Sequence, residues 1–484
     1  MYGPEPLWVA LPDLWDRLRA GLALPAVDHP RIDGPLDWYA SHPEYLARVV
    51  DRAAPFLHRI LERVEARGMP TELALLPVVE SAFRPFAYSH GRAAGIWQFI
   101  PGTGRRFGLK QNWWYDGRRD VIASTEAALD YLEDLHARFD GDWLLALAAY
   151  NTGAGNVQRA IRRNERRGRA MSFWDLALPR ETRGYVPKLL AVSRVVAEPR
   201  RHGVRLRALP DAPQIAVVGV GSQIDLALAA ELAGVSVETL YRLNPGFNRW
   251  ATAPDGPHRL VLPIDRAEVF RGALAEVPAS KRVRWTRHRV RAGETLSGLA
   301  GRYRTTVGVL RRVNGLRGHL IRVGQNLVVP VASREPAGYS LSAEQRRATL
   351  REIERRGRKT VHVVRPGDTL WEIARRYEVA VRTLARWNGM APADPLHPGR
   401  KLVIWVPERE AALDLPRLNA APPGALQAVR YRVRRGDSLS RIARRFRVSV
   451  ADLRRWNTLP RGRYLQPGQA LKLYVDVTKQ TGRL

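Results

Sequence analysis

Three segments of the chain repeat one residue pattern in register, and this repeat limits the possible folds more than any other feature. The segments begin at His288, His362 and Tyr431, and each holds a glycine, an acidic residue and then Ser or Thr. Self-similarity of this kind is typical of small modules that recur along a chain. In each copy an asparagine follows the glycine 21 positions later, in the pairs Gly293 and Asn314, Gly367 and Asn388, and Gly436 and Asn457.

The third copy predicts a strand, two helices and a second strand. Residues 431–434 alternate as a strand does, Ser438 is placed to cap a helix, and residues 470–475 form the closing strand. The apolar residues of the two helices recur at helical spacing. They are Leu439, Ile442, Ala443 and Phe446 in the first helix and Val450, Leu453 and Trp456 in the second.

This βααβ order and its Gly-acid-Ser/Thr turn resemble the LysM domain, a family that binds polymers containing N-acetylglucosamine. The resemblance implies a glycan groove between the loop before the first helix and the loop after the second. Alternatively, the same residues only form the turn and cap the helix. The glycan-binding positions that it implies are Gly293, Glu294, Thr295, Gly367, Asp368, Thr369, Gly436, Asp437 and Ser438.

The first part of the chain holds a glutamate at the end of an apolar helical run. We expect an amphipathic helix over residues 51–66 and a second helix that Thr71 caps and Glu80 closes. Apolar neighbours and the negative end of a helix dipole disfavour a carboxylate and raise its pKa. A carboxyl group that stays protonated near neutrality can cleave a glycosidic bond as a general acid. Alternatively, Glu80 simply ends its helix in solvent.

Four separated motifs surround this glutamate in the sequence: ESAF at 80–83, GIWQF at 95–99, AYNTG at 149–153 and ETRGYVPK at 181–188. In this order they resemble the catalytic domain of the soluble lytic transglycosylases, which are lysozyme-like enzymes of bacterial cell walls. The resemblance covers about residues 35–200 and implies that Glu80 is the sole catalytic acid. It also implies the substrate-binding residues Ser81, Gly95, Trp97, Gln98, Phe99, Tyr150, Asn151 and Tyr185.

Five of these substrate-binding residues also have a structural interpretation. Trp97, Phe99 and Tyr185 would then be ordinary core aromatics, and Gln98 and Asn151 would form buried hydrogen bonds. For the glycine of GIWQF, the functional interpretation is a backbone that approaches a sugar closely.

The family's mechanism uses one carboxyl group, whereas most glycosidases need two. Asp116 and Asp120 are the plausible second acids if the enzyme is instead a hydrolytic muramidase, although their stretch favours an Asp-Arg structural network. In the family's route, Glu80 protonates the oxygen between N-acetylmuramic acid and N-acetylglucosamine while the 2-acetamido group stabilises C1. Glu80 then deprotonates the C6 hydroxyl, which closes a 1,6-anhydro ring. A third hypothesis is a non-catalytic glycan-binding scaffold.

The predicted fold class is multidomain, with a mainly α lysozyme-like catalytic domain followed by small α+β (βααβ) LysM domains. Residues 204–280 resemble a degenerate LysM unit that lacks the Gly-acid-Thr turn. The expected divisions are an N-terminal helical extension (1–34), the catalytic domain (35–203), the degenerate unit (204–280), LysM units at 286–331, 360–406 and 430–476, and linkers at 332–359 and 407–429.

The net charge of +32 lies almost wholly in the second half of the chain, since residues 1–280 carry +3 and residues 281–484 carry +29. This placement favours weak attraction to the anionic cell wall rather than nucleic acid, for which no motif is present. We therefore expect peptidoglycan glycan strands as the partner, no nucleic-acid partner and a monomer. Neither a cofactor nor a metal is expected, because the histidines lack ligand spacing.

The absence of cysteine excludes disulfides, thiolate metal sites and a lipobox anchor from this sequence. No apolar run is long enough to span a membrane, and the first residues lack the order of a signal peptide. We expect a protein of the bacterial periplasm or cell envelope whose leader lies outside this sequence.

Overall fold

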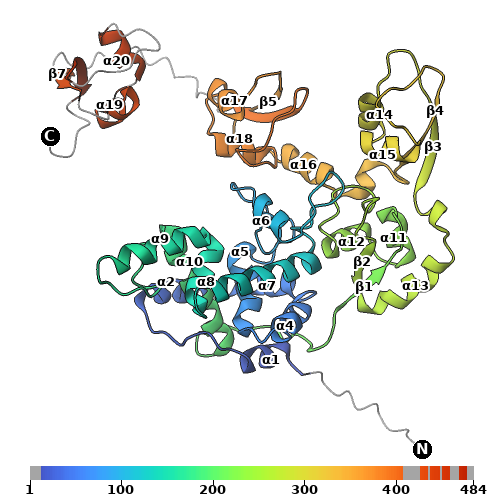
Figure 1. The fold of residues 1–484 in the computed structure, drawn as a ribbon, viewed down its shortest axis with the longest axis horizontal. Helices are drawn as coiled ribbons and strands as arrows, with labels where there is room; N and C mark the ends of the chain where they lie inside the picture. Colours follow the sequence, from blue (N-terminus) through green and yellow to red (C-terminus); the bar gives the residue numbers. More distant parts are fainter. Residues whose placement is uncertain are drawn as a thin grey trace, which may run out of the picture. The chain divides into compact units, whose positions relative to one another are not determined.

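The computed structural model describes residues 12–406, 426–433, 437–446, 448, 450–457 and 468–476. The chain divides into two compact units, residues 1–406 and 407–484, and each is described by itself. The first unit begins with a helical domain and continues with small units of two strands and two helices (Figure 1). The predicted fold class, a mainly helical domain followed by βααβ units, is confirmed.

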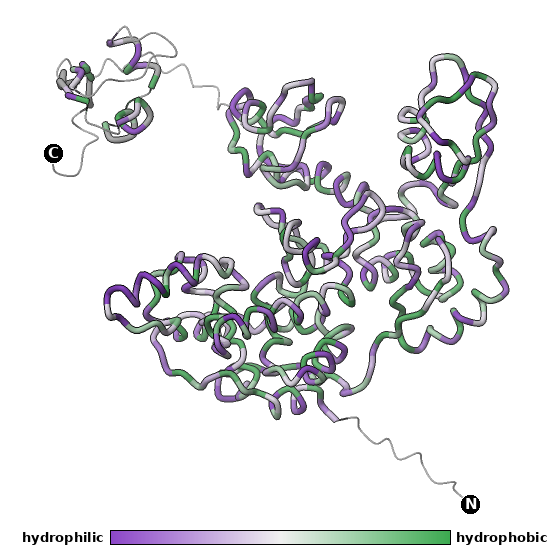
Figure 2. Tube along the Cα trace, viewed as in Figure 1, coloured by the Kyte–Doolittle hydropathy of each residue, from purple (hydrophilic) through white to green (hydrophobic). Residues whose placement is uncertain are grey.

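The helical domain packs its helices around a single apolar core. At its centre lies α8, which is hydrophobic on every side, whereas α9 is mostly hydrophilic and covers the surface (Figure 2). The elements are α1 (Leu14–Ala20), α2 (Pro30–Ala40), α3 (Pro43–Ala53), α4 (Leu57–Glu65), η1 (Thr71–Leu75), α5 (Leu76–Ser81), α6 (Pro101–Arg106), α7 (Val121–Arg138), α8 (Trp143–Thr152), α9 (Ala154–Glu165) and α10 (Arg180–Ala197).

Two expectations about this domain are wrong. The single helix expected over 51–66 is two helices, α3 and α4, with Pro55 between them, because proline has no N–H to donate. Thr71 caps no helix: its hydroxyl donates to the carbonyl of Leu18 at 2.7 Å, and the chain after it forms the 3₁₀ turn η1. Glu80 nevertheless lies in the last turn of the following helix, as expected.

The N-terminal residues belong to the helical domain as far as they are described. Leu14, Trp15 and Leu18 of α1 are buried in its core, and α2 runs across the expected boundary at residue 34. Helix α1 packs into this core because its apolar face would otherwise be exposed to water.

Residues 215–263 form a strand, two helices and a strand that pack on the helical domain. They are β1 (Ile215–Gly219), α11 (Leu226–Leu232), α12 (Val237–Leu243) and β2 (Arg259–Pro263), followed by η2 (Ile264–Arg266), α13 (Ala267–Ala275) and η3 (Ala279–Lys281). The strands are antiparallel, and Asp225 caps α11 in place of the missing Ser or Thr. Trp114 and Tyr115 of the helical domain share this unit's core.

Three further βααβ units follow, and the two strands of each are antiparallel neighbours. The first has β3 (Arg284–Arg289), α14 (Leu296–Arg302), α15 (Val307–Val313) and β4 (Asn326–Val331). The second has β5 (Arg358–Val363), α17 (Leu370–Arg376), α18 (Val381–Trp387) and β6 (Lys401–Val406). The third has β7 (Leu426–Arg432), α19 (Leu439–Arg445), α20 (Val450–Asn457) and β8 (Ala470–Asp476).

The repeated asparagine joins the second helix of each unit to the closing strand. In the second unit, Nδ2 of Asn388 donates to the carbonyl oxygens of Leu384 and Val403, and its Oδ1 accepts from the amide of Val403. Asn314 and Asn457 form the same three bonds in their units. Asn244 does so after α12, which shows that residues 215–263 share the construction of the repeats.

Replacing Asn388 by Ala is expected to weaken the second unit by about 2–4 kcal/mol, because buried backbone groups lose their partners. Hydrogen exchange of the Val403 amide should then accelerate roughly 30-fold or more. Asn326→Ala, which removes an exposed amide at the start of β4, is the matched control. An unchanged exchange rate at Val403 would contradict this role.

The stretch 332–359, expected as a linker, holds the helices η4 (Pro336–Tyr339) and α16 (Ala343–Glu352). Tyr339 is buried, and its hydroxyl donates to the carboxylate of Asp225 at 2.8 Å. The stretch 332–359 has few apolar residues, and charged residues surround them in the sequence. These apolar residues nevertheless pack on the unit of residues 215–263. Of the other expected linker, residues 407–425 lie outside the described residues, and β7 begins at Leu426.

Of the helices that the structure describes, none combines the length and hydrophobicity needed to cross a membrane.

Candidate active site

Glu80 lies in the last turn of α5 and faces a tyrosine from α10. The hydroxyl of Tyr185 donates a hydrogen bond to Oε1 of Glu80. Burial raises the pKa of Glu80 to about 7, while the bond from Tyr185 opposes this rise and the nearby carboxylate of Glu181 adds to it. The predicted rise in the pKa of Glu80 is therefore present, and burial is its main cause.

A cleft of about 350 Å³ opens at Glu80. Among the described residues, Glu80 is the one carboxylate that lines it, and the rest of the wall mixes apolar, hydroxyl and amide groups with the guanidinium of Arg84. The lining residues are Tyr45, Val78, Val79, Glu80, Ser81, Ala82, Arg84, Ala87, Tyr88, Ser89 and Gln98. Such a surface can hold a sugar by hydrogen bonds and ring contacts.

Ser81 and Gln98 line this cleft and also fix its shape. Oγ of Ser81 donates to the carbonyl of Ile96 at 2.9 Å, which joins the end of α5 to the GIWQF loop. Nε2 of Gln98 donates to the carbonyl of Gly95 at 2.7 Å within that loop. The structure therefore places both residues at the cleft, where sequence analysis expected them.

The two aromatic residues of GIWQF belong to the core. Trp97 is 0% exposed and donates through Nε1 to Thr125, and Phe99 is 3% exposed. For these two side chains the structure favours the structural interpretation over contact with a sugar. The carbonyl of Trp97 accepts a bond from the Tyr150 hydroxyl at 2.9 Å, so this loop still orients a predicted site residue.

Contacts within the protein itself require glycine at position 95. Its φ is +81°, and a Cβ built on it would lie 1.9 Å from the carbonyl oxygen of Arg118. The close approach expected for a sugar is therefore occupied by the backbone of residues 118–119.

Tyr150 and Asn151 come from the end of α8. Burial and the nearby Glu80 raise the pKa of Tyr150 well above its ordinary value, and the same causes act on Tyr185. Both phenols therefore remain hydrogen-bond donors at neutral pH. Oδ1 of Asn151 accepts from the hydroxyl of Thr182 at 2.8 Å, which ties α8 to α10.

The two candidate second acids are engaged in structural networks. Asp116 forms ion pairs with Arg118 at 2.8 Å and Arg119 at 3.2 Å. Although burial opposes ionisation, these guanidinium groups hold the pKa of Asp116 below its usual range. Asp120 caps α7 and accepts bonds from Tyr115 and Arg259. The predicted Asp-Arg structural network is present.

The turn residues of the βααβ units stabilise the turn and the first helix. Gly293 and Gly367 have φ values of +81° and +87°. Glu294 accepts from the amide of Arg291 and from His288, which lower its pKa to about 2.

In the second unit Asp368 accepts from Arg365 and His362 in the same way, and in the third Asp437 accepts from Tyr431. Thr295, Thr369 and Ser438 accept bonds from backbone amides of the first helix. Gly436 lies outside the described residues. These bonds fit the turn-and-cap interpretation, and glycan contact by these residues stays a prediction.

Several cleft residues escaped the sequence analysis. Tyr45, Arg84 and Tyr88 line the cleft, and the charge of Glu181 raises the pKa of Glu80. The motif ETRGYVPK contains Glu181 and could have pointed to it. Within the described chain, no group of three or more Asp, Glu and His residues is arranged as a metal site.

Family models match the chain in five places. Residues 62–173 match the transglycosylase SLT domain, and residues 214–279 match the LysM-like domain of lytic transglycosylase MltD. Residues 288–330, 362–405 and 431–473 match the LysM domain.

Individual proteins match over different parts of the chain. Membrane-bound lytic murein transglycosylase D of Escherichia coli K12 is 38% identical over 408 residues, which cover 81% of this chain and 86% of that protein. A putative tributyltin chloride resistance protein of Alteromonas sp. strain M-1 is 39% identical over 191 residues, 39% of this chain and 90% of that protein. An autolysin of Enterococcus faecalis is 32% identical over 41% of this chain and 26% of its own length.

Proposed function

Because the chain belongs to the family of membrane-bound lytic murein transglycosylase D, a family of lytic transglycosylases that act on peptidoglycan, we propose that Glu80 is its only catalytic acid and base. The bond cleaved is the β-1,4 bond between N-acetylmuramic acid and N-acetylglucosamine. The new muramic end is a 1,6-anhydro ring, and water takes no part in the cleavage.

The first step transfers the proton of Glu80 to the glycosidic oxygen, which leaves with the N-acetylglucosamine. The carbonyl oxygen of the muramoyl 2-acetamido group stabilises C1 as the bond breaks. The Glu80 carboxylate then removes the proton of the C6 hydroxyl, whose oxygen bonds to C1 and displaces the acetamido oxygen. The proton returns to Glu80, so the enzyme ends the cycle as it began.

The observation that carries this proposal is a single carboxyl group with a pKa of about 7 in an open cleft. A group with this pKa can donate a proton and take it back near neutral pH. Asp116 and Asp120, which a hydrolytic muramidase would need, are held by arginines and a helix terminus. These bonds support the one-acid route over the two-acid route.

Tyr185 acts as a positioning residue for Glu80 through its hydrogen bond. Tyr150, Asn151, Gln98 and Ser81 bind the sugars or hold the cleft in shape. The LysM units hold the enzyme on the glycan, and their positive charge adds a weak attraction to the anionic wall. The site of action is accordingly the bacterial cell envelope.

The pH profile of kcat/KM tests the role of Glu80 as an acid. Since the reactive form is protonated, kcat/KM should fall as the pH rises through about 7. Anhydro product released from peptidoglycan is measured at each pH. The upper end of the series, pH 9, lies about two pH units above the expected pKa. A value of kcat/KM that stays level from pH 6 to pH 9 contradicts the assignment.

Tyr185→Phe is expected to move this alkaline limb to higher pH, because the bond from Tyr185 lowers the pKa of Glu80. The rate on the acidic plateau should fall roughly tenfold, since Glu80 loses its orienting partner. Tyr39→Phe, in a buried tyrosine of α2, is the control and should leave the profile unchanged. A limb that stays in place in Tyr185→Phe would show that the hydroxyl does not act on Glu80.

A further inference from the structure

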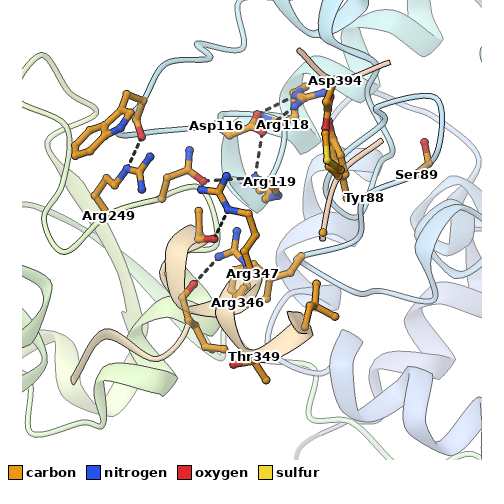
Figure 3. A pocket seen from close by; sticks show the side chains of 18 of the residues that line it. Tyr88, Ser89, Asp116, Arg118, Arg119, Arg249, Arg346, Arg347, Thr349 and Asp394 are labelled. Carbon is orange, nitrogen blue, oxygen red and sulfur yellow. Dashed lines mark hydrogen bonds and ion pairs between the residues drawn. The ribbon is translucent and has the colours of Figure 1, made fainter. Parts of the chain in front are cut away.

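A second and larger cavity, of about 760 Å³, shares wall residues with the cleft of Glu80. Figure 3 shows the side chains that line this cavity. Its walls come from four parts of the first unit: the helical domain, the unit of residues 215–263, the helix α16 and the second βααβ repeat. Six arginines, Arg118, Arg119, Arg249, Arg346, Arg347 and Arg386, line it, whereas its carboxylates are Asp116 and Asp394. The volume lies in the range of ligand pockets.

Positive charge exceeds negative charge in this cavity. Asp116 is shared by two arginines, Arg118 and Arg119. Asp394 accepts bonds from the hydroxyl of Tyr88 and forms an ion pair with Arg92 outside the lining. Among the described residues, neither carboxylate forms an ion pair with the remaining arginines of the wall.

Four further arginines line the wall, Arg249, Arg346, Arg347 and Arg386, and the first three are held by neutral groups. Arg249 donates to the carbonyl of Trp113 at 3.1 Å, Arg347 to that of Ala343 at 2.8 Å, and Arg346 to that of Leu341. Within the described ranges, none of the three forms an ion pair. Nε of Arg119 is also buried and has no hydrogen-bond partner among the described residues.

The pKa values of these arginines reflect the crowding. Burial and the charge of Arg119 lower the pKa of Arg346 to about 9, and burial and Arg347 lower that of Arg249 to about 10. Like charges in a half-buried site repel one another, and a bound anion would remove this cost. The excess of positive charge in the wall therefore favours an anionic ligand.

The cavity and the catalytic cleft share part of their walls. Tyr88 and Ser89 line both of them. A glycan strand bound at Glu80 carries acidic peptides on its muramic acid residues. Guanidinium groups bind carboxylates through paired hydrogen bonds. The rings of Phe86 and Trp113 stack under two of these groups, those of Arg346 and Arg249, at 4.2 and 3.9 Å, and so fix their positions in the wall.

We propose that this arginine-lined cavity binds the carboxylates of the peptide stem attached to the glycan strand in the catalytic cleft. The proposal rests on the proposed function, because it takes the glycan at Glu80 as given. It makes Arg346 and Arg347 of α16 specificity-determining residues for strands that carry peptides. It also explains why the residues between the first two LysM repeats form a packed helix against the helical domain.

The test compares two substrates with the full-length protein. One is glycan strands with their peptide stems, and the other is the same strands after an amidase has removed the stems. The variant Arg346→Ala/Arg347→Ala is compared with Arg200→Ala/Arg205→Ala, which removes the same charge from two exposed arginines outside both linings. The double variant in α16 should raise KM about tenfold or more for strands with stems and leave KM for bare strands unchanged.

Binding is measured separately in full-length Glu80→Gln with the dipeptide L-alanyl-D-glutamate as the probe. The α16 substitutions should abolish its binding, and the control substitutions should not. Equal KM changes on both substrates would overturn the proposal. So would displacement of the stem-bearing strands by inorganic phosphate or an oligonucleotide but not by the dipeptide. If the wild-type protein releases no anhydro ends from either substrate, the proposed function fails instead.

Discussion

Replacing Glu80 by Gln is expected to lower kcat for glycan cleavage roughly a thousandfold or more, because one side chain supplies both proton transfers. The amide has nearly the same shape, and its oxygen can still accept the bond from Tyr185. Binding to peptidoglycan should therefore stay near the wild-type level. The measurement is anhydro-muropeptide release from sacculi, together with a pull-down of the protein on the same sacculi.

Glu44→Gln, which removes an exposed carboxylate from α3, is the matched control and should keep full activity. A Glu80→Gln protein that still releases product at a rate within a few-fold of wild type would remove the acid-base role from this residue. Another carboxylate would then have to supply the proton, and the first candidate is Glu181, whose charge acts on Glu80.

Gly95→Ala is expected to destabilise the helical domain by about 3–5 kcal/mol. The new methyl group would lie 1.9 Å from the carbonyl oxygen of Arg118, and this backbone cannot move as a flexible side chain can. The left-handed φ of +81° adds to the strain. The thermal midpoint of the helical domain should fall by roughly 10 °C, and activity at growth temperature should fall with it.

Gly102→Ala provides the comparison, since a Cβ at Gly102 in α6 has nothing within 4 Å. Alanine is the better helix former, so this change should be neutral or slightly stabilising. Equal midpoints for the two variants would mean that the approach between residues 95 and 118 is looser than the structure has it.

The repeats were the most predictable part of the chain because their signals are local. Ser438 as a cap and the apolar stripe after it depend on neighbours only a few residues away. The break at Pro55 was equally local, but the amphipathic pattern of 51–66 hid it. The prediction that Thr71 caps a helix was wrong for another reason. Its hydroxyl donates a hydrogen bond to the carbonyl of Leu18, 53 positions earlier in the chain.

The candidate site was predictable at Glu80 and uncertain in the residues around it. A motif names the residues of a loop but not which of them face a ligand. Trp97 and Gln98 are adjacent in the sequence, yet one is fully buried in the core and the other lines the cleft. The two side chains point in different directions because the backbone at Gln98 has a φ of +51°, which no pattern of residue types reveals.

The arginine-lined cavity was beyond prediction for a similar reason. Arg119, Arg249 and Arg346 come from three parts of the chain that only the fold brings together. Counting charge along the sequence placed the excess in the second half, with +3 in residues 1–280 and +29 after them. The fold adds that three arginines from that second half, Arg346, Arg347 and Arg386, line a cavity together with residues of the near-neutral catalytic domain.

The chemical nature of the cut ends tests the central claim most directly. Sacculi are digested with the wild-type protein in water enriched in oxygen-18, and the muropeptides are weighed by mass spectrometry. If Glu80 acts alone and the C6 hydroxyl attacks C1, the new muramic ends are 1,6-anhydro rings, one water lighter than reducing ends and free of the label. Reducing muramic ends that carry oxygen-18 would contradict the account and establish hydrolysis.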